Sequence, residues 1–216
     1  MGKSLAIIGR GHSVTKCNKN FVDNHDEVAI INYVIFNNYN HLISNRADHL
    51  FTNKTGLRYS EIDIQQLNLK NMYFTWHSYQ RFERTNPKVK TIYPKPNLHE
   101  KILADYGFKP SSGMQCLYYF LNNCNYSEIS LIGFDFYEVG SIPYYFKPSE
   151  CLSEQRYLWE GDYKGNKINT PSGHDTDKSI KFLEKMVKLY SNITFNIISH
   201  NKKVNSLSYN NLNIIF

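Results

Sequence analysis

Short apolar runs that alternate with segments of helical periodicity constrain the fold of this 216-residue chain more than any other feature. The runs are almost continuously hydrophobic, which is typical of strands buried on both faces of a sheet. We predict strands at residues 4–8, 27–31, 47–52, 71–76, 89–93, 128–132 and 193–198. Their alternation with helices predicts an α/β fold with a mostly parallel sheet flanked by helices.

Helical spacing of apolar residues predicts helices at residues 60–67, 98–106, 111–123 and 175–190. In the last of these, apolar side chains recur every three or four residues. Gly107 is placed to end the second helix, and Ser111 or Ser112 is placed to cap the third. These signals indicate helices that cross between parallel strands.

Residues 140–172 combine Pro, Gly, Tyr and charged residues without a strand or helix period. Connections of this length without regular structure are uncommon in compact domains and are usually functional. We therefore expect residues 1–139 and 173–216 to form one domain, with 140–172 inserted as a lid over the active site.

The net charge of +6 and the pI of about 9.0 favour an anionic partner: a nucleotide, a nucleic acid, an acidic glycan or a membrane surface. No run of Lys and Arg exceeds two residues, which weakens a nucleic-acid-binding function. The four cysteines contain no CxxC pair, so neither a zinc ribbon nor a thioredoxin-type site is indicated.

No apolar stretch approaches the roughly 20 residues of a membrane-spanning helix. The apolar run near the amino terminus is also too short for a signal peptide. We expect a cytoplasmic protein, and peripheral association with the inner face of the membrane stays open.

Parallel sheets bind ligands beyond the carboxyl ends of their strands. Five residues of functional interest follow predicted strands directly or closely: Gly9, Asn32, Asn53, Asp135 and Tyr137. The run GRGHS at residues 9–13 is a broken GxGxxG, whose glycines suit either a tight turn or close approach to a phosphate or ribose. Asn32 stands where a dinucleotide-binding fold would place an acid, which argues against NAD.

Two further motifs lie at predicted helix starts. Hydroxyls, a glycine and free N–H groups at residues 111–113 suit an anion or a nucleobase as well as an ordinary cap. His174 lies between the long loop and the last helix, where an imidazole can titrate near neutrality. Asp175 and Asp177 match a DxD metal motif, but their position at a helix start favours capping, so we predict no metal site.

Taken together, these motifs resemble a known family. The run SSGMQCLYYFLNNCNYSEISLIGFDFYEVGS resembles the sialyltransferase core, and SGHDTDKSIKFLEKM resembles the segment with the catalytic histidine. The chain is most similar to the small bacterial CMP-sialic acid transferases of glycosyltransferase family 42, over roughly residues 4 to 200. The resemblance implies a Rossmann-like GT-A variant and a metal-independent, inverting enzyme with no cofactor besides its donor, CMP-sialic acid.

The resemblance also implies roles for individual residues. His174 corresponds to the general base, and Tyr137 and Tyr144 correspond to phenols that support the departing phosphate. Lys109 and Tyr145 would contact substrate, although the family often has Arg where this chain has Lys109. The nucleotide contacts would be Gly9, Arg10, Gly11, Ser13, Asn32, Asn53, Ser112, Gly113 and Asp135.

The resemblance implies a sialyltransferase that acts on a galactosyl or sialyl glycan, as in lipooligosaccharide or capsule synthesis. Two alternatives to this function stay open. The first is transfer of another CMP-activated sugar, such as Kdo, because a CMP pocket does not distinguish these donors. The second is a non-catalytic nucleotide- or glycan-binding domain. The expected partners are a CMP-sugar donor and a glycan or glycolipid acceptor, not nucleic acid; homo-oligomerisation is not decided by the sequence.

Overall fold

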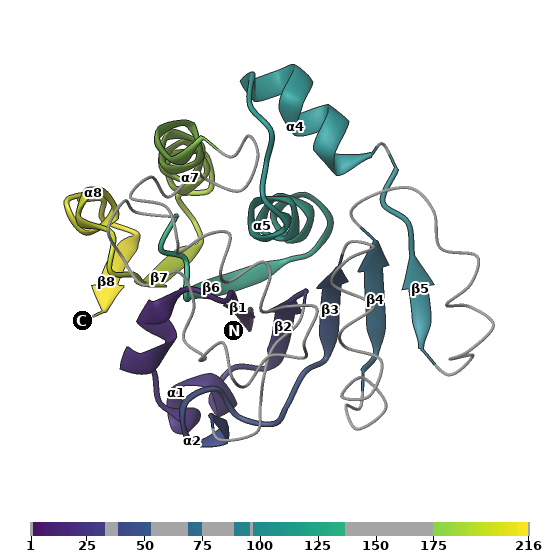
Figure 1. Cartoon of the computed structure of the whole chain (residues 1–216), viewed down its shortest axis with the longest axis vertical. Coiled ribbons are helices and arrows are strands. Elements are labelled where there is room, and N and C mark those ends of the chain that lie inside the picture. Colours follow the sequence, from purple (N-terminus) through teal and green to yellow (C-terminus); the bar gives the residue numbers. More distant parts are fainter. Residues whose placement is uncertain are drawn as a thin grey trace, which may run out of the picture.

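The computed structural model describes residues 2–32, 39–52, 69–74, 89–95, 97–136 and 175–215. Within these ranges, eight strands form one sheet in the order β5-β4-β3-β2-β1-β6-β7-β8, and every neighbouring pair is parallel (Figure 1). The strands are β1 Lys3–Ile8, β2 Glu27–Ile31, β3 His49–Thr52, β4 Asn71–Phe74, β5 Lys90–Ile92, β6 Tyr126–Ile132, β7 Thr194–Ile198 and β8 Leu212–Ile215. The predicted α/β fold with a parallel sheet is confirmed.

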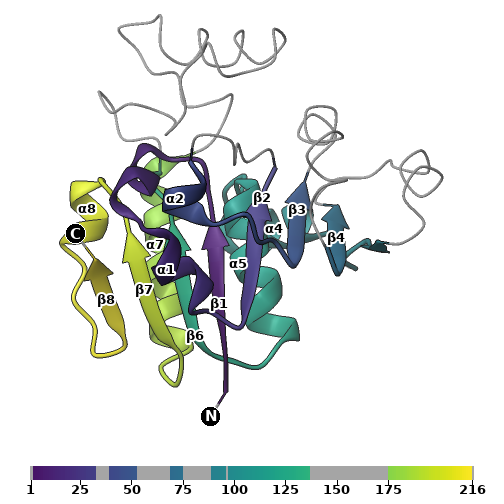
Figure 2. The ribbon, with the colours of Figure 1, turned by 90° about the horizontal axis from the view of Figure 1, so that it is seen from below.

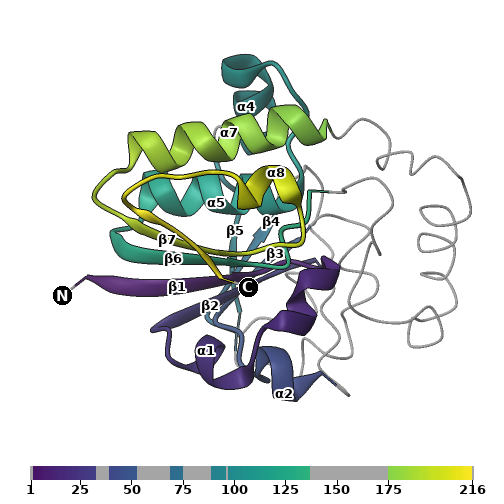
Figure 3. The same cartoon turned by 90° about the vertical axis from the view of Figure 1, so that its left-hand side faces the viewer.

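Helices cover both faces of the sheet, as Figures 1 and 3 show. One face carries the 3-10 helix η1 (His12–Lys16), α1 (Lys19–Asp23) and α2 (Asn40–Ile43). The other carries α4 (Leu98–Tyr106), α5 (Ser112–Asn123), α7 (Thr176–Leu189) and α8 (Lys202–Asn205). Because helices cover both faces of the sheet, alternate residues of β1 belong to two separate buried clusters. Leu5 and Ile7 lie on one face, and Ala6 and Ile8 lie on the other.

The order of the strands reverses beside β1. The chain steps outward from β1 to β5, returns through α4 and α5 to place β6 against the other side of β1, and continues to β7 and β8. Because the strands are parallel, their carboxyl ends lie at one edge of the sheet, and the strand order reverses between β1 and β6 (Figure 2). In α/β folds, this reversal is where ligands bind.

Most predicted elements match within two residues. Gly107 ends α4 with a φ of +69°, and the Ser111 side chain accepts a hydrogen bond from the Met114 N–H, as expected of a cap. Strand β8 and the short helices were not predicted; helices of four or five residues are little more than one turn, which is too short to show a helical period. The helix expected at 60–67 and the lid expected at 140–172 lie outside the described residues.

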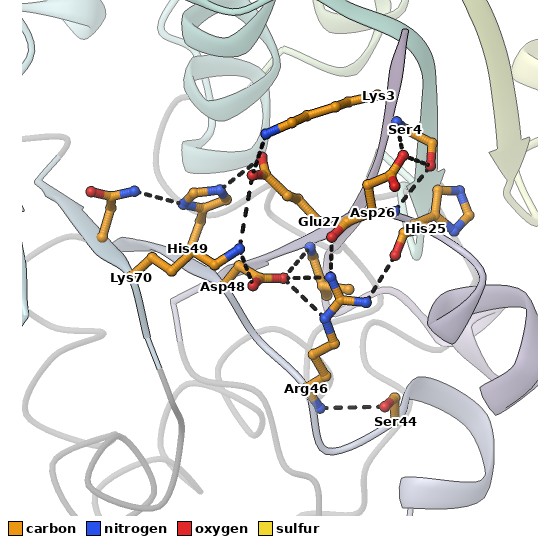
Figure 4. Close-up of polar contacts among 12 residues, drawn as sticks. Lys3, Ser4, His25, Asp26, Glu27, Ser44, Arg46, Asp48, His49 and Lys70 are labelled. Atoms are coloured by element: carbon orange, nitrogen blue, oxygen red, sulfur yellow. Dashed lines mark hydrogen bonds and ion pairs between the residues drawn. The ribbon is translucent and has the colours of Figure 1, made fainter. Parts of the chain in front are cut away.

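A polar network joins the amino ends of the central strands (Figure 4). The Glu27 carboxylate accepts hydrogen bonds from Tyr126 Oη, from His49 Nε2 at 3.3 Å and from Lys3 Nζ at 3.3 Å. Burial opposes ionisation of Glu27, but these hydrogen bonds outweigh it and lower the pKa of its carboxyl to about 2.

The same network continues beside β3. The Asp48 carboxylate accepts bonds from Val28 N at 2.9 Å and Arg46 Nε at 3.1 Å, and it lies 2.9 Å from Lys70 Nζ. Arg46 also donates to the backbone carbonyls of His25 and Asp26. The network therefore ties β1, β2, β3 and β6 together at the edge opposite the strand ends.

Candidate active site

Eight of the predicted site residues lie at the carboxyl edge of the sheet or at the start of α5. Those after β1, β2 and β6 are Gly9, Arg10, Gly11, Ser13, Asn32 and Asp135, and those in α5 are Ser112 and Gly113. Lys109 is exposed, two residues before the Ser111 cap. Asn53, Tyr137, Tyr144, Tyr145 and His174 lie outside the described residues.

The glycines after β1 allow close contact with the end of β6. The N–H of Gly9 donates to the Ile132 carbonyl at 2.7 Å, and the N–H of Gly11 donates to the Gly133 carbonyl at 3.0 Å. A Cβ atom on Gly9 would lie 2.7 Å from the Gly133 oxygen, and one on Gly11 would lie 2.5 Å from Asp135 Oδ2. Packing of this turn therefore requires both glycines, and their contact with a nucleotide stays a prediction.

Asp135 joins three loops at the carboxyl edge. Its Oδ2 accepts from the Ser13 N–H at 2.8 Å, and its Oδ1 accepts from the His200 N–H at 2.8 Å and from Ser199 Oγ at 3.3 Å. Its carbonyl accepts from Asn201 Nδ2 at 3.1 Å. The side chain is only 5% exposed, so both carboxylate oxygens are engaged in holding the loops after β1, β6 and β7 together.

The amino end of α5 presents hydrogen-bond donors. The first two helical N–H groups, those of Ser112 and Gly113, have no acceptor in the described part of the chain. A Cβ atom on Gly113 would lie 2.8 Å from the Phe134 ring, so the glycine lets the helix start close to the end of β6. Open donors and the dipole of a 12-residue helix favour an anion at this point.

Two residues other than glycine at this edge have left-handed backbone. Asn32 has a φ of +54° and donates its N–H to the Phe51 carbonyl at 2.7 Å. Phe136 has a φ of +51°, which is strained for a bulky side chain. Strain of this kind concentrates at functional sites, and Phe136 directly precedes Tyr137.

The residues on either side of the undescribed segment 137–174 are in contact. Thr176 Oγ1, in the first turn of α7, donates to the Phe136 carbonyl at 2.7 Å. Phe136, which precedes Tyr137, and Thr176, which lies two residues after His174, are therefore held together at the carboxyl edge.

A pair of histidines at the same edge was not assigned a role from sequence. The rings of His12 and His200 stack with centroids 5.3 Å apart and an interplanar angle of 28°. Both residues are partly buried, and they flank the loops that Asp135 joins. His12 lies within the GRGHS run, and His200 follows β7 by two residues, so the strand-end rule could have indicated both.

The DxD residues take part in ordinary helix contacts. Asp175 caps α7, and its side chain accepts from the Lys178 N–H at 2.9 Å, as predicted. Asp177 pairs with Lys203 Nζ at 2.5 Å. Among the residues that the structure describes, no three His, Cys, Asp or Glu side chains gather as a metal site. In that same part of the chain, no helix has the length and apolarity to cross a bilayer.

The fold was compared with those of known proteins. No protein-family model matches the chain, and no curated protein matches it. Among solved structures, the sialyltransferase CstII from Campylobacter jejuni in complex with cytidine-5'-monophosphate superposes with a TM-score of 0.64 at 16% identity, covering 98% of this chain and 84% of that one. CstII with CMP-3FNeuAc gives 0.62 at 18% identity, covering 100% and 95%.

A mammalian sialyltransferase in complex with Gal-beta-1-3GalNAc-ortho-nitrophenol gives a TM-score of 0.59 at 15% identity, covering 90% of this chain and 69% of that chain. The chain has the sialyltransferase fold. The Rossmann-like fold implied by the sequence motifs is therefore confirmed, and the match extends over nearly the whole chain.

Proposed function

We propose that this protein is an inverting, metal-independent glycosyltransferase that moves sialic acid from CMP-sialic acid to a galactosyl or sialyl glycan. The proposal rests mainly on the groups found at the carboxyl edge of the sheet. The fold is that of the sialyltransferases, and the N–H groups of Ser112 and Gly113 at its carboxyl edge, which have no acceptor among the described residues, suit a phosphate.

The donor would bind along this edge. The amino end of α5 suits its phosphate, while Asn32 and Asn53 follow neighbouring strands, where amide groups can bond a ribose or a base. Asp135 supports the proposal indirectly, because it fixes the loops that would border the nucleotide. No cofactor is required, since the leaving group is the CMP of the donor.

The chemistry would rest on His174 and two phenols. His174 would remove the proton of the acceptor hydroxyl as this oxygen attacks the anomeric carbon, and CMP would leave from the opposite face. Tyr137 and Tyr144 would stabilise the phosphate dianion that forms on departure. A bound metal would not be needed, because phenol and helix N–H groups would stabilise the developing charge.

Residues 140–172 would close over the donor as a lid and limit its hydrolysis by water. Lys109 and Tyr145 would contact the donor carboxylate or the acceptor. Both substrates are expected in the cytoplasm, where the acceptor would be a glycan in lipooligosaccharide or capsule synthesis.

CMP release in the presence of a lactose-type acceptor tests this proposal. We expect release from CMP-sialic acid that depends on acceptor, persists in EDTA and yields a product of inverted anomeric configuration. Release from CMP-Kdo alone would change the sugar but not the reaction class. CMP binding without turnover of either donor would contradict the enzyme and leave a nucleotide-binding domain.

A further inference from the structure

Lysine side chains form a stripe along the outer surface of α7. Lys178, Lys181, Lys185 and Lys188 are spaced by three, four and three residues, so they share one face of the helix, and all four are exposed. The opposite face is buried, with Ile180, Leu183, Met186 and Val187 packed in the core. Figure 3 shows α7 in the outer layer of helices, with α8 nearby.

Helix α8 adds two exposed lysines to this surface. Lys203 Nζ lies 2.5 Å from Asp177 of α7, which joins the two helices at their amino ends, and Lys202 precedes it. We call these six residues the lysine face: Lys178, Lys181, Lys185, Lys188, Lys202 and Lys203.

The lysine face carries more positive than negative charge. Its six lysines are accompanied on α7 and at its cap by three carboxylates, Asp175, Asp177 and Glu184. Six lysines against three carboxylates leave this surface with a surplus of three positive charges. The ion pairs are exposed, so they are screened by solvent and leave the positive potential of the surface largely in place.

An exposed apolar side chain stands at the end of this stripe. Leu189, next to Lys188 and at the last position of α7, is 63% exposed, more than any other large hydrophobic side chain that the structure describes. Leu103 on neighbouring α4 is 39% exposed. Lysines beside protruding leucines are typical of surfaces that bind bilayers, where the cations meet anionic headgroups and the leucines enter the interface.

We propose that the lysine face docks this protein on an anionic lipid bilayer. With α7 lying along the headgroups, its amino end would keep the carboxyl edge of the sheet close to the bilayer, because Asp175 directly follows His174. This orientation suits an acceptor glycan attached to a lipid, and it adds a membrane contact to the proposed function. The contact itself requires neither donor nor catalysis.

Vesicle co-sedimentation without any donor tests the proposal. The probes are vesicles of phosphatidylcholine alone and vesicles in which roughly one lipid in three is phosphatidylglycerol. We expect binding to the anionic vesicles, weakening as salt is raised. The triple variant K181Q/K185Q/K188Q should lose about 30- to 100-fold in affinity, since each lysine near a charged surface contributes severalfold.

A matched triple variant removes the same charge elsewhere. Lys3, Lys19 and Lys90 are exposed and lie on β1, α1 and β5, so K3Q/K19Q/K90Q should bind anionic vesicles within about threefold of wild type. Leu189→Ser should weaken binding about 3- to 10-fold, because it removes apolar contact without changing charge. Unfolding temperatures of all variants check that the fold persists.

Equal losses in the two triple variants would overturn the proposal, since net charge rather than this face would then be responsible. Tighter binding to a duplex DNA or RNA oligonucleotide than to anionic vesicles, lost in the α7 variant, would also overturn it. If the protein binds vesicles through α7 but has no transferase activity, the proposed function is contradicted and the membrane contact is not. CMP release with a lactose-type acceptor should be unchanged in the α7 variant.

Discussion

At the amino edge of the sheet, charged side chains are bonded to one another, whereas at the carboxyl edge the backbone carries strain and open hydrogen-bond donors. Glu27 and Asp48 each accept several bonds at the amino edge. At the opposite edge, Phe136 has left-handed backbone, and the N–H groups of Ser112 and Gly113 have no acceptor within the described ranges. The first arrangement stabilises the fold, and the second leaves groups for a ligand.

This difference gives each edge its own experimental signature. Variants at the amino edge should lower stability and leave catalysis unchanged. Variants at the carboxyl edge should change catalysis or substrate binding by more than their effect on stability explains. The four predictions below test this division, and they begin with the largest expected effect.

Replacing His174 by alanine should reduce transfer by about 10²- to 10⁴-fold, the usual contribution of one general base. CMP affinity should stay within about twofold, because the imidazole is proposed to act on the acceptor hydroxyl. Initial rates of CMP release and calorimetric binding of CMP measure the two quantities. Turnover like that of wild type would remove His174 from the role of base.

Replacing Glu27 by glutamine should remove a pH-dependent part of the stability. The folded pKa of Glu27, about 2, is lower than its ordinary value, so its contribution is present above about pH 4.5 and is lost as the pH falls towards 2. At neutral pH we expect the free energy of unfolding to fall by about 2 to 3 kcal/mol. Denaturant titrations between acid and neutral pH measure this.

The variant should also show a flatter acid limb than wild type, because glutamine has no carboxyl to protonate. Its CMP release, measured where the variant is folded, should equal that of wild type. A specific loss of activity with unchanged stability would contradict the assignment of the amino edge to the fold alone.

The two edges also differ in how well sequence alone predicts them. The strands, the Ser111 cap and the glycine that ends α4 were predictable, because each depends on residues within one or two turns of chain. The GFDFY run marked Asp135 as a site residue, but its bonds to Ser13 and His200 span 122 and 65 residues. Only the strand order 2-1-6-7 brings these loops together.

For the same reason, neither the stacking of His12 on His200 nor the network around Glu27 could be predicted from the sequence. Their partners come from strands that are adjacent in the sheet but distant in sequence. Short sequence motifs and their resemblance to a known family were enough to predict the fold. They did not indicate which polar residues bond to one another, since register and strand order decide that.

Replacing Asp135 by asparagine should lower both stability and activity. An amide keeps one acceptor oxygen but places an NH₂ group against one of the N–H donors of Ser13 and His200. We expect a loss of about 1 to 3 kcal/mol in the free energy of unfolding, with reduced CMP affinity as the loops separate. A variant as stable as wild type that fails to bind CMP would instead make Asp135 a direct nucleotide contact.

The smallest effect should come from removing single helix caps, and here the chain offers a matched pair. The side chains of Ser111 and Asn97 each accept a backbone N–H bond, at the starts of α5 and α4. Either alanine variant should cost about 1 kcal/mol in stability, the ordinary value of a cap. Only Ser111→Ala should raise the KM for the CMP-sugar, by about 2- to 5-fold, because a frayed first turn misplaces the N–H groups of Ser112 and Gly113. Since the two substitutions remove the same kind of bond, an equal change in KM would mean that α5 contributes only to the fold. If the KM rises only in the Ser111→Ala variant, the anion binds at the amino end of α5, at the carboxyl edge of the sheet.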